Sequence, residues 1–265
     1  MELEITVVDA FTDSVFGGNP AAVIITDEWL PDNLMQSIAA ENNLSETAFL
    51  VAADPATYSI RWFSPMTEID FCGHATLASA FVLFSRCSEL ANIKFLAEAV
   101  GELLVEKVET GRVQMNFPNT KPDKVEAIPD YLVAGLSIPP KEVYSNSQAY
   151  FVIYESESDV LSVQCNNDTL KKLGPLDVVV TSQSDSQDYD FTSRYFWPAN
   201  GGDEDPVTGS IHTGLAPLWA ERLGKNNLVA FQASKRGGVL KCVVAGQRVI
   251  ISGNAVQYLN GTITV

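Results

Sequence analysis

RWFSP, at Arg61–Pro65, returns as RYFWP at Arg194–Pro198. A short acidic stretch follows each copy, and a glycine then opens an apolar segment, GHATL from Gly73 and GSIHT from Gly209. A later stretch also matches between the two parts of the chain, GELLVEKVETGRVQMNF in the first and GVLKCVVAGQRVIISG in the second. Three matches in the same order, separated by roughly half the chain rather than by a short solenoid period, indicate two related halves.

Each half predicts the same order of elements. A strand leads through a glycine-containing loop into a helix, and a two-strand hairpin follows, its turn marked by Thr110-Gly111 in one half and Ala245-Gly246 in the other. The predicted helices differ, because residues 73–84 are almost wholly apolar, whereas the second helix keeps a polar edge and contains Pro217, which should kink it. The predicted bounds are Tyr58–Ser64, Gly73–Arg86, Leu103–Val108 and Arg112–Phe117, then Phe191–Trp197, Gly209–Leu223, Val239–Val244 and Arg248–Ser252.

This pattern predicts an α+β fold of two pseudo-symmetric halves, each a mostly antiparallel sheet wrapped around a central helix. Short turns between the strands argue against a doubly wound parallel sheet, which needs long crossovers. We place the halves at residues 1–117 and 118–265, with the last strand free to cross back to the first half. Phe117–Pro129, which holds three prolines among charges, is the predicted linker.

Composition narrows the classes of partner. The chain has 265 residues, of which 46% are hydrophobic, and a formal charge of −16. That charge repels phosphate backbones and anionic lipids, so we expect neither nucleic acid nor a membrane as partner. The N-terminus lacks the pattern of a signal peptide, and four scattered cysteines suggest neither a disulfide framework nor a zinc site. We therefore expect a soluble cytoplasmic protein with no metal.

Three residues are candidates for chemistry. Glu46 lies between a predicted helix, Asp32–Glu41, and an apolar strand, where loss of solvent favours its protonated form and suits proton transfer. His74 begins the apolar helix, and Asp205 precedes the second glycine. Each also has a purely structural reading: an exposed junction glutamate, a core histidine and a helix cap.

Two other site classes are not supported. The acidic run that begins at Asp203 resembles half of a calcium loop, but its twelfth position is Gly214, where a bidentate glutamate is needed. Ser210 and His212 suggest a hydrolase, yet the chain has neither a G-x-S-x-G sequence nor a P-loop.

The two glycine-opened helices offer an anion site. If the halves are related by an approximate two-fold axis, both helix N-termini could point into the cleft between them, where free N–H groups attract negative charge. A small anionic substrate would then find the local positive feature that the acidic chain otherwise lacks. The alternative is a pair of tight turns that pack helices on sheets.

At this point the motifs resemble those of the phenazine-biosynthesis PhzF-like proteins. The matching segments run in order along essentially the whole chain: Phe16–Val23 (FGGNPAAV), Asn43–Thr47 (NLSET), Cys72–Ala78 (CGHATLA) and Glu204–Ser210 (EDPVTGS). The resemblance implies a diaminopimelate-epimerase-like fold, commonly as a homodimer, and a cofactor-free isomerase activity.

The resemblance also assigns roles. It implies that Glu46 shuttles a proton on a carboxylate-bearing substrate while His74 and Asp205 assist. By the same match, Ser45, Gly73, Gly209 and Ser210 line the substrate site.

Two rival functions stay open. The wider superfamily includes epimerases with two cysteines just before the helix-opening glycines; here Cys72 fills the first place and Thr208 the second. A Cys72-dependent epimerase with another partner is therefore one alternative, and Cys72 as a small buried residue is its structural reading. A non-catalytic small-molecule-binding or stress-related protein on the same fold is the other.

Overall fold

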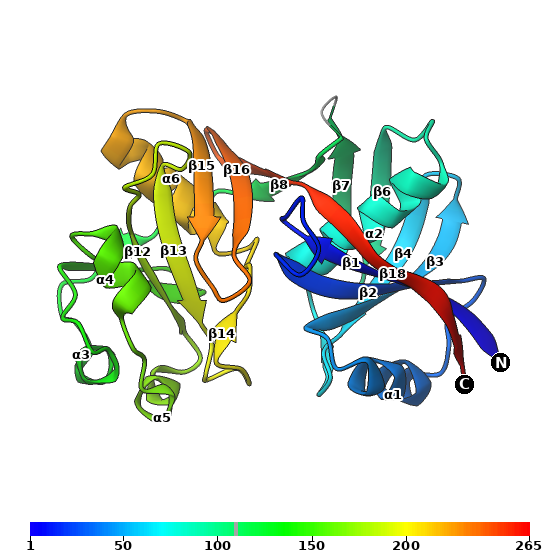
Figure 1. Cartoon of the computed structure of the whole chain (residues 1–265), viewed down its shortest axis with the longest axis horizontal. Coiled ribbons are helices and arrows are strands. Elements are labelled where there is room, and N and C mark those ends of the chain that lie inside the picture. The colour runs from blue at the N-terminus through cyan, green and yellow to red at the C-terminus, as the bar shows by residue number, and fades with distance from the viewer. Residues whose placement is uncertain (109–110) are drawn as a thin grey trace. The chain divides into compact units, whose positions relative to one another are not determined.

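A computed structural model describes residues 1–108 and 111–265. The chain forms two compact units, one of Met1–Asn116 with Ser252–Val265 and one of Phe117–Ile251 (Figure 1). Thr110, which we assigned to the first hairpin turn, lies outside the described residues. No helix in these described ranges is long and apolar enough to span a lipid bilayer.

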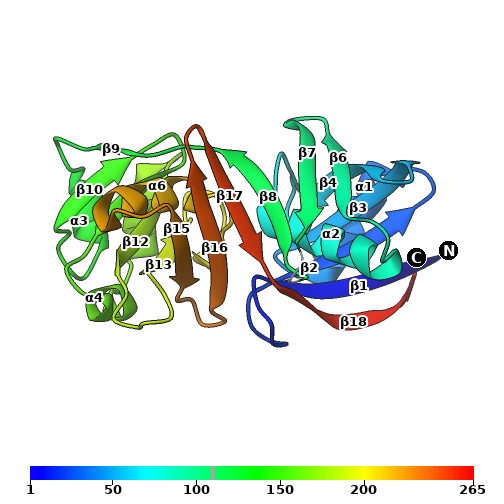
Figure 2. The ribbon, with the colours of Figure 1, turned by 90° about the horizontal axis from the view of Figure 1, so that it is seen from above.

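The first unit is a curved sheet around one helix. Its strands pair in the order β18–β1–β2–β3–β4–β6–β7–β8. The short β5 pairs with the end of β4, on the same edge as β6, because β3 occupies the other edge. Helix α2 packs against β1, β2 and β3 and also against β7 and β18, so the sheet curls around it (Figure 2). The elements are β1 (Glu2–Ala10), β2 (Asn19–Thr26), α1 (Asp32–Asn42), β3 (Glu46–Asp54), β4 (Thr57–Phe63), β5 (Glu68–Ile69), α2 (Gly73–Arg86), β6 (Asn92–Ala97), β7 (Gly101–Lys107), β8 (Val113–Pro118) and β18 (Ala255–Thr264).

The second unit repeats this plan around α6. Its strands pair in the order β9–β10–β11–β12–β13–β15–β16, with the short β14 beside β13, and α6 packs on β15 and β16. The elements are β9 (Asp123–Lys124), α3 (Asp130–Gly135), β10 (Glu142–Ser145), β11 (Ala149–Ile153), α4 (Glu157–Ser162), α5 (Asn167–Leu170), the 3₁₀ turn η1 (Lys171–Leu173), β12 (Asp177–Gln183), β13 (Phe191–Phe196), β14 (Glu204–Asp205), α6 (His212–Leu223), β15 (Asn227–Gln232), β16 (Gly238–Ala245) and β17 (Arg248–Gly253).

The two units share one topology. β2–β3 is parallel, β3–β4 antiparallel, β4–β6 parallel and β6–β7 antiparallel, and the series β11–β12, β12–β13, β13–β15 and β15–β16 repeats these directions. In both series the connection between the two parallel strands, β4 to β6 or β13 to β15, contains the central helix. The predicted α+β class with two like-built halves is therefore confirmed.

The second helix departs from the prediction at its start. It begins at His212 rather than Gly209, because the N–H groups of residues 212, 213 and 214 bond to carbonyls three residues back and form a tight turn first. It also continues through Pro217. Proline has no N–H to bond the carbonyl of Thr213, and the N–H of Thr120 occupies that carbonyl instead, at 3.2 Å.

The predicted linker Phe117–Pro129 is wrong, because this segment belongs to the second unit. Asn119 donates its backbone N–H to the carbonyl of Gln247 at 2.9 Å, and Val125 donates to Val143 at 2.9 Å. Its charged side chains are exposed, but Pro122 is buried and the backbone pairs with the unit, so composition alone was misleading.

Each unit has its own apolar core. In the first, α2 is buried along nearly its whole length, as residues 73–84 predicted. In a cluster with Met35 and Ile38 of α1, Phe49 of β3 is fully buried and meets Phe63 edge to face, with ring centroids 5.5 Å apart. In the second, Val160, Val180 and Phe196 join the strands to α4.

We expect Phe49→Ala to destabilise the first unit by about 3–5 kcal/mol, because it leaves a cavity where an aromatic ring was fully enclosed. Urea denaturation followed by tryptophan fluorescence measures the change. Leu104→Ala on β7 is the control, since Leu104 is 60% exposed and should alter stability by less than about 0.5 kcal/mol. Equal effects of the two substitutions would contradict the assignment of Phe49 to the core.

Candidate functional site

Glu46 and His74 meet in the first unit. Glu46 is the first residue of β3, opposite Ala21 of β2, and His74 is the second residue of α2. Glu46 Oε2 lies 2.8 Å from His74 Nε2, and the two side chains are only 11% and 7% exposed. Residues far apart in sequence thus form a nearly enclosed carboxyl–imidazole pair.

The other nitrogen of His74 faces two further residues. Asn19 Nδ2 lies 3.1 Å from His74 Nδ1, and Cys72 Sγ lies 3.4 Å from the same atom. Asn19 reaches this place because Gly18 turns the chain with φ of +60°, where a Cβ atom would lie 2.0 Å from the carbonyl oxygen of Ala10. The FGGNP stretch therefore delivers Asn19 to the ring, a role that the sequence analysis did not assign.

The electrostatics favour a charged ring. Burial lowers the pKa of His74. The Cys72 sulfur and the Glu46 carboxylate raise that pKa by more than burial lowers it, so the net pKa lies well above the ordinary value. We attribute the rise mainly to Glu46, because burial and that same carboxylate raise the pKa of Cys72 to about 11 and keep it a neutral thiol near pH 7. An imidazolium–carboxylate pair is therefore favoured at neutral pH. Because both nitrogens of the charged ring carry hydrogen, the group of the Asn19 amide that can accept from Nδ1 is its oxygen.

The same residues form the one metal-ligand group found in the described part of the chain. The ligand atoms of Glu46, Cys72 and His74 lie within 4.8 Å of one another. A metal would have to displace protons from both the thiol and the imidazolium, and the raised pKa of each opposes that loss. The group is better suited to hold a proton than a metal ion.

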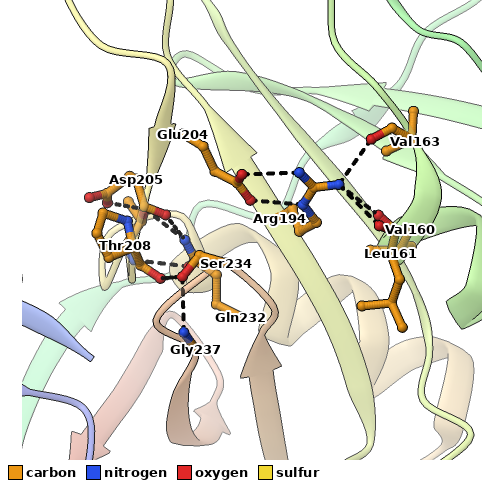
Figure 3. A network of polar contacts seen from close by, with 11 residues as sticks. Val160, Leu161, Val163, Arg194, Glu204, Asp205, Thr208, Gln232, Ser234 and Gly237 are labelled. Atoms are coloured by element: carbon orange, nitrogen blue, oxygen red, sulfur yellow. Dashed lines mark hydrogen bonds and ion pairs between the residues drawn. The ribbon is translucent and has the colours of Figure 1, made fainter. Parts of the chain in front are cut away.

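Asp205 lies in the second unit, where a buried glutamine fixes its loop. Gln232, fully buried on β15, accepts the N–H of Thr208 at 2.9 Å and donates to the carbonyl of Asp205 at 2.9 Å (Figure 3). Thr208 Oγ1 donates to the Asp205 carboxylate, and Ser234 Oγ donates to the carbonyl of Pro206 at 2.8 Å. Gln232 was missed from the sequence, because an isolated glutamine at a strand end carries no local signal.

The repeated arginines hold the short strands that precede the helices. Arg194 Nε and Nη2 donate to the two oxygens of Glu204 at 2.8 and 3.0 Å, and Arg194 also bonds the carbonyl of Val163 (Figure 3). Arg61 binds Glu68 in the same two-pronged way, at 2.7 and 2.6 Å. The arginines that revealed the repeat thus have a structural role, anchoring β5 and β14 to the sheet.

Strand register also matches Cys72 with Thr208. Trp62 pairs with Ile69 in the first unit as Tyr195 pairs with Asp205 in the second, and Cys72 and Thr208 follow these strands by the same number of residues. The place that would carry a second thiol therefore carries a hydroxyl, already engaged with the Asp205 carboxylate. This geometry disfavours the two-cysteine mechanism.

The predicted site residues form two groups. Ser45, Glu46, Gly73 and His74 are adjacent in the first unit, and Gly73 is buried at the start of α2. Asp205, Gly209 and Ser210 lie close along the loop that precedes α6 in the second unit.

A family model described as phenazine biosynthesis-like protein matches residues 8–261. The chain belongs to this family. A Pseudomonas aeruginosa protein named an uncharacterized isomerase is 47% identical, with 99% of each chain covered. The crystal structure of an Enterococcus faecalis PhzF family protein is 41% identical, covers 100% of both chains and superposes with a TM-score of 0.94.

The comparisons also place the fold. A predicted epimerase from Pseudomonas aeruginosa shares 21% identity over 99% of each chain with a TM-score of 0.75, a likeness that concerns the fold alone. The architecture is that of the diaminopimelate-epimerase-like proteins, as the resemblance implied. Three of its curated relatives are named uncharacterized isomerases, which supports the isomerase class at the level of the family.

The pKa values of the two histidines should be shifted in opposite directions from that of free histidine. His74 should stay protonated at pH 7 because of Glu46, whereas burial lowers the pKa of His212 to about 4 and keeps it neutral at that pH. Histidine-selective ¹⁵N NMR from pH 3 to 9 measures both. Because the chain has only 2 histidines, a His212→Asn variant assigns the signals, and a His74 ring that is neutral at pH 7 would contradict the ion pair.

Cysteine alkylation should discriminate among the four thiols. Iodoacetamide at pH 7.5 should label the exposed Cys87 within minutes and leave Cys72 and Cys242 unlabelled, because those two are buried thiols with pKa values raised to about 11 and about 12. Peptide mass spectrometry gives the order of labelling. Rapid labelling of Cys72 would indicate a reactive thiolate and reopen a Cys72-dependent epimerase.

Proposed function

We propose that this protein is a cofactor-independent isomerase that shifts a proton on a small carboxylate-bearing molecule, with Glu46 as its acid–base residue. The observation that carries the proposal is the 2.8 Å contact between Glu46 and His74, both nearly enclosed. Its membership in a family with three curated relatives named uncharacterized isomerases supports the reaction class.

The chemistry needs one group that takes a proton from carbon and returns it. As a carboxylate, Glu46 can accept the proton of a C–H bond while the freed electron pair forms a double bond to the next carbon and the existing double bond shifts. The protonated carboxyl then delivers the same proton to the far carbon on the same face. Atoms and electrons balance without an oxidant or reductant.

His74 supports both stages of this transfer. Its imidazolium stabilises the Glu46 carboxylate before the proton is taken, at a site where burial would otherwise disfavour a charge. When Glu46 is protonated, the N–H groups of the ring can donate hydrogen bonds to the negative charge that develops on the substrate. Asn19 limits the orientation of the ring through its contact with Nδ1.

The remaining predicted residues suit an anionic substrate. Gly73 begins α2, and Gly209 and Ser210 lie in the turn that precedes α6, where backbone N–H groups lack helical partners. Ser45 precedes Glu46 along the chain. We assign these residues to substrate binding and Asp205 to an assisting role in proton transfer.

The test is a screen of small carboxylic acids in heavy water, with enzyme-dependent deuterium incorporation as the readout. We expect Glu46→Gln to keep the fold and to lower the exchange rate by at least about two orders of magnitude, because the amide cannot carry the proton. Glu41→Gln is the matched control, since Glu41 is an exposed glutamate on α1, and it should leave the rate unchanged.

Near-normal exchange in Glu46→Gln would remove Glu46 from the reaction. Ligand binding to the wild-type protein without deuterium incorporation into any compound would instead favour a non-catalytic binding protein.

A further inference from the structure

The internal repeat places a second buried carboxyl group where Glu46 lies in the first unit. Glu46 opens β3 opposite Ala21, and Asp177 opens β12 opposite Ala149 in the same parallel register. The next residues along the strands, Thr47 and Val178, pair with Phe63 and Phe196, the matching phenylalanines of the repeat. Asp177 is thus the counterpart of Glu46.

The environment of Asp177 differs from that of Glu46. Its side chain is buried, one oxygen accepts the hydroxyl of Tyr195, and the other accepts Asn200 Nδ2 at 2.8 Å. Both oxygens therefore bond to groups of the same unit. Burial raises the pKa of Asp177 and these two donors lower it, with a net rise.

A directed chain of hydrogen bonds runs from Asp177 to Ser210. Gln148 Nε2 lies 3.2 Å from the hydroxyl oxygen of Tyr195 and 2.9 Å from Ser210 Oγ. Tyr195 has a single hydroxyl hydrogen, and Asp177 accepts it, so Tyr195 can only accept from Gln148. This favours the amide nitrogen of Gln148 at this position, because an amide oxygen 3.2 Å from the Tyr195 oxygen would face another acceptor with no hydrogen between them.

The direction of these hydrogen bonds determines whether the Ser210 hydroxyl can donate one to a ligand. Both hydrogens of the Gln148 amide nitrogen are used, one on Tyr195 and one on Ser210 Oγ. Ser210 Oγ thus receives a hydrogen bond, and its own hydroxyl hydrogen has no acceptor within the portions of the chain that the structure covers. The hydroxyl is left as a donor for a ligand.

We infer that Gln148, oriented by the Asp177–Tyr195 pair, is a positioning residue that makes Ser210 a hydrogen-bond donor to an anionic group of the substrate, a carboxylate above all. This inference rests on the proposed function, since it assigns the substrate carboxylate to Ser210. A carboxylate oxygen offers only acceptor sites and forms stronger hydrogen bonds than a neutral acceptor, so this arrangement selects for it.

The repeat thus retains a carboxyl group at one position of both units and uses it differently. In the first unit Glu46 contacts His74, the residue after Gly73, directly. In the second, Ser210 follows the matching Gly209, and Gln148 and Tyr195 lie between it and Asp177. A side-chain amide does not readily pass on a proton, so these hydrogen bonds orient Ser210 and do not transfer protons to it.

The experiment is a double-variant cycle with benzoate as the probe. Binding is followed by the shift of the backbone signal of residue 210, serine or alanine, in ¹H–¹⁵N NMR spectra of the full-length protein, with benzyl alcohol as the uncharged comparison. We expect Ser210→Ala to weaken benzoate binding about tenfold and Gln148→Met about five- to tenfold, since each removes or misdirects one hydrogen bond to a charged group.

The decisive measurement is Gln148→Met in the Ser210→Ala background. If Gln148 acts through Ser210, the second substitution should change the benzoate affinity by less than about twofold there. Gln183→Met on β12 is the matched control, because Gln183 is an exposed glutamine of the same unit, and it should leave binding unchanged. An equal loss in both backgrounds would indicate a merely structural role and overturn the inference.

A second variant guards against misfolding. Tyr195→Phe keeps the ring and removes only the hydroxyl that orients the Gln148 amide, so it should weaken benzoate binding in the wild-type background and not with Ser210→Ala. Absence of any benzoate shift at Ser210, or equal binding of benzyl alcohol, also overturns the assignment.

Failure of the proposed reaction is separable from failure of this inference. Glu46→Gln should lower deuterium exchange by at least about two orders of magnitude yet bind benzoate at Ser210 as the wild type does. Once an exchanging substrate is known, Gln148→Met should raise its KM more than it lowers kcat.

Discussion

A buried carboxyl group needs a partner, and the structure depends on how each unit supplies one. Glu46 begins a strand in an apolar environment where an isolated carboxylate would be strongly disfavoured, and His74 at the start of α2 provides the compensating charge. The pair forms only because the sheet curls around α2 and brings the start of β3 to the start of that helix. The fold and the candidate chemistry therefore have the same physical basis.

The second unit meets the same requirement in another way. Asp177 lies at the corresponding strand position, but a hydroxyl donor and an amide donor satisfy it. A carboxyl group that faces an imidazolium can exchange a proton with a ligand, whereas one enclosed by neutral donors serves as an anchor. The two units, built on one architecture, thus have different proposed roles: proton transfer in the first and anion binding in the second.

The loops before the two helices show how the fold keeps these groups in place. Arg61 and Arg194 each bind a glutamate of a short strand, and these strands lead into the loops that carry Cys72 and Thr208. In the second unit Gln232 bonds the Asp205–Thr208 loop through both ends of its amide. Such contacts lower the freedom of the loop, and a positioned carboxylate needs that restriction.

The sequence by itself determined the repeat, the α+β class and the chemical type of the site residues. These follow from local order: the echo around Arg61 and Arg194 repeats in register, and the apolar run from Gly73 specifies a buried helix. The motifs around Glu46, His74 and Asp205 also lie within single short segments. Two predictions were wrong, the linker and the start of the second helix. The supposed linker pairs with the second unit through distant partners, as Thr120 does with the carbonyl of Thr213. The helix starts late because a tight turn forms ahead of His212.

Only the tertiary structure decided which side chains meet. Asn19, Gln148, Asp177 and Gln232 were not singled out, since each is an ordinary polar residue whose role arises from a partner many positions away. The pKa of His74 is likewise a property of three segments brought together, because burial and the Glu46 carboxylate act on it through space. Sequence specifies the groups that can donate, accept or carry charge; their distances, and hence their chemistry, are set by the folded chain.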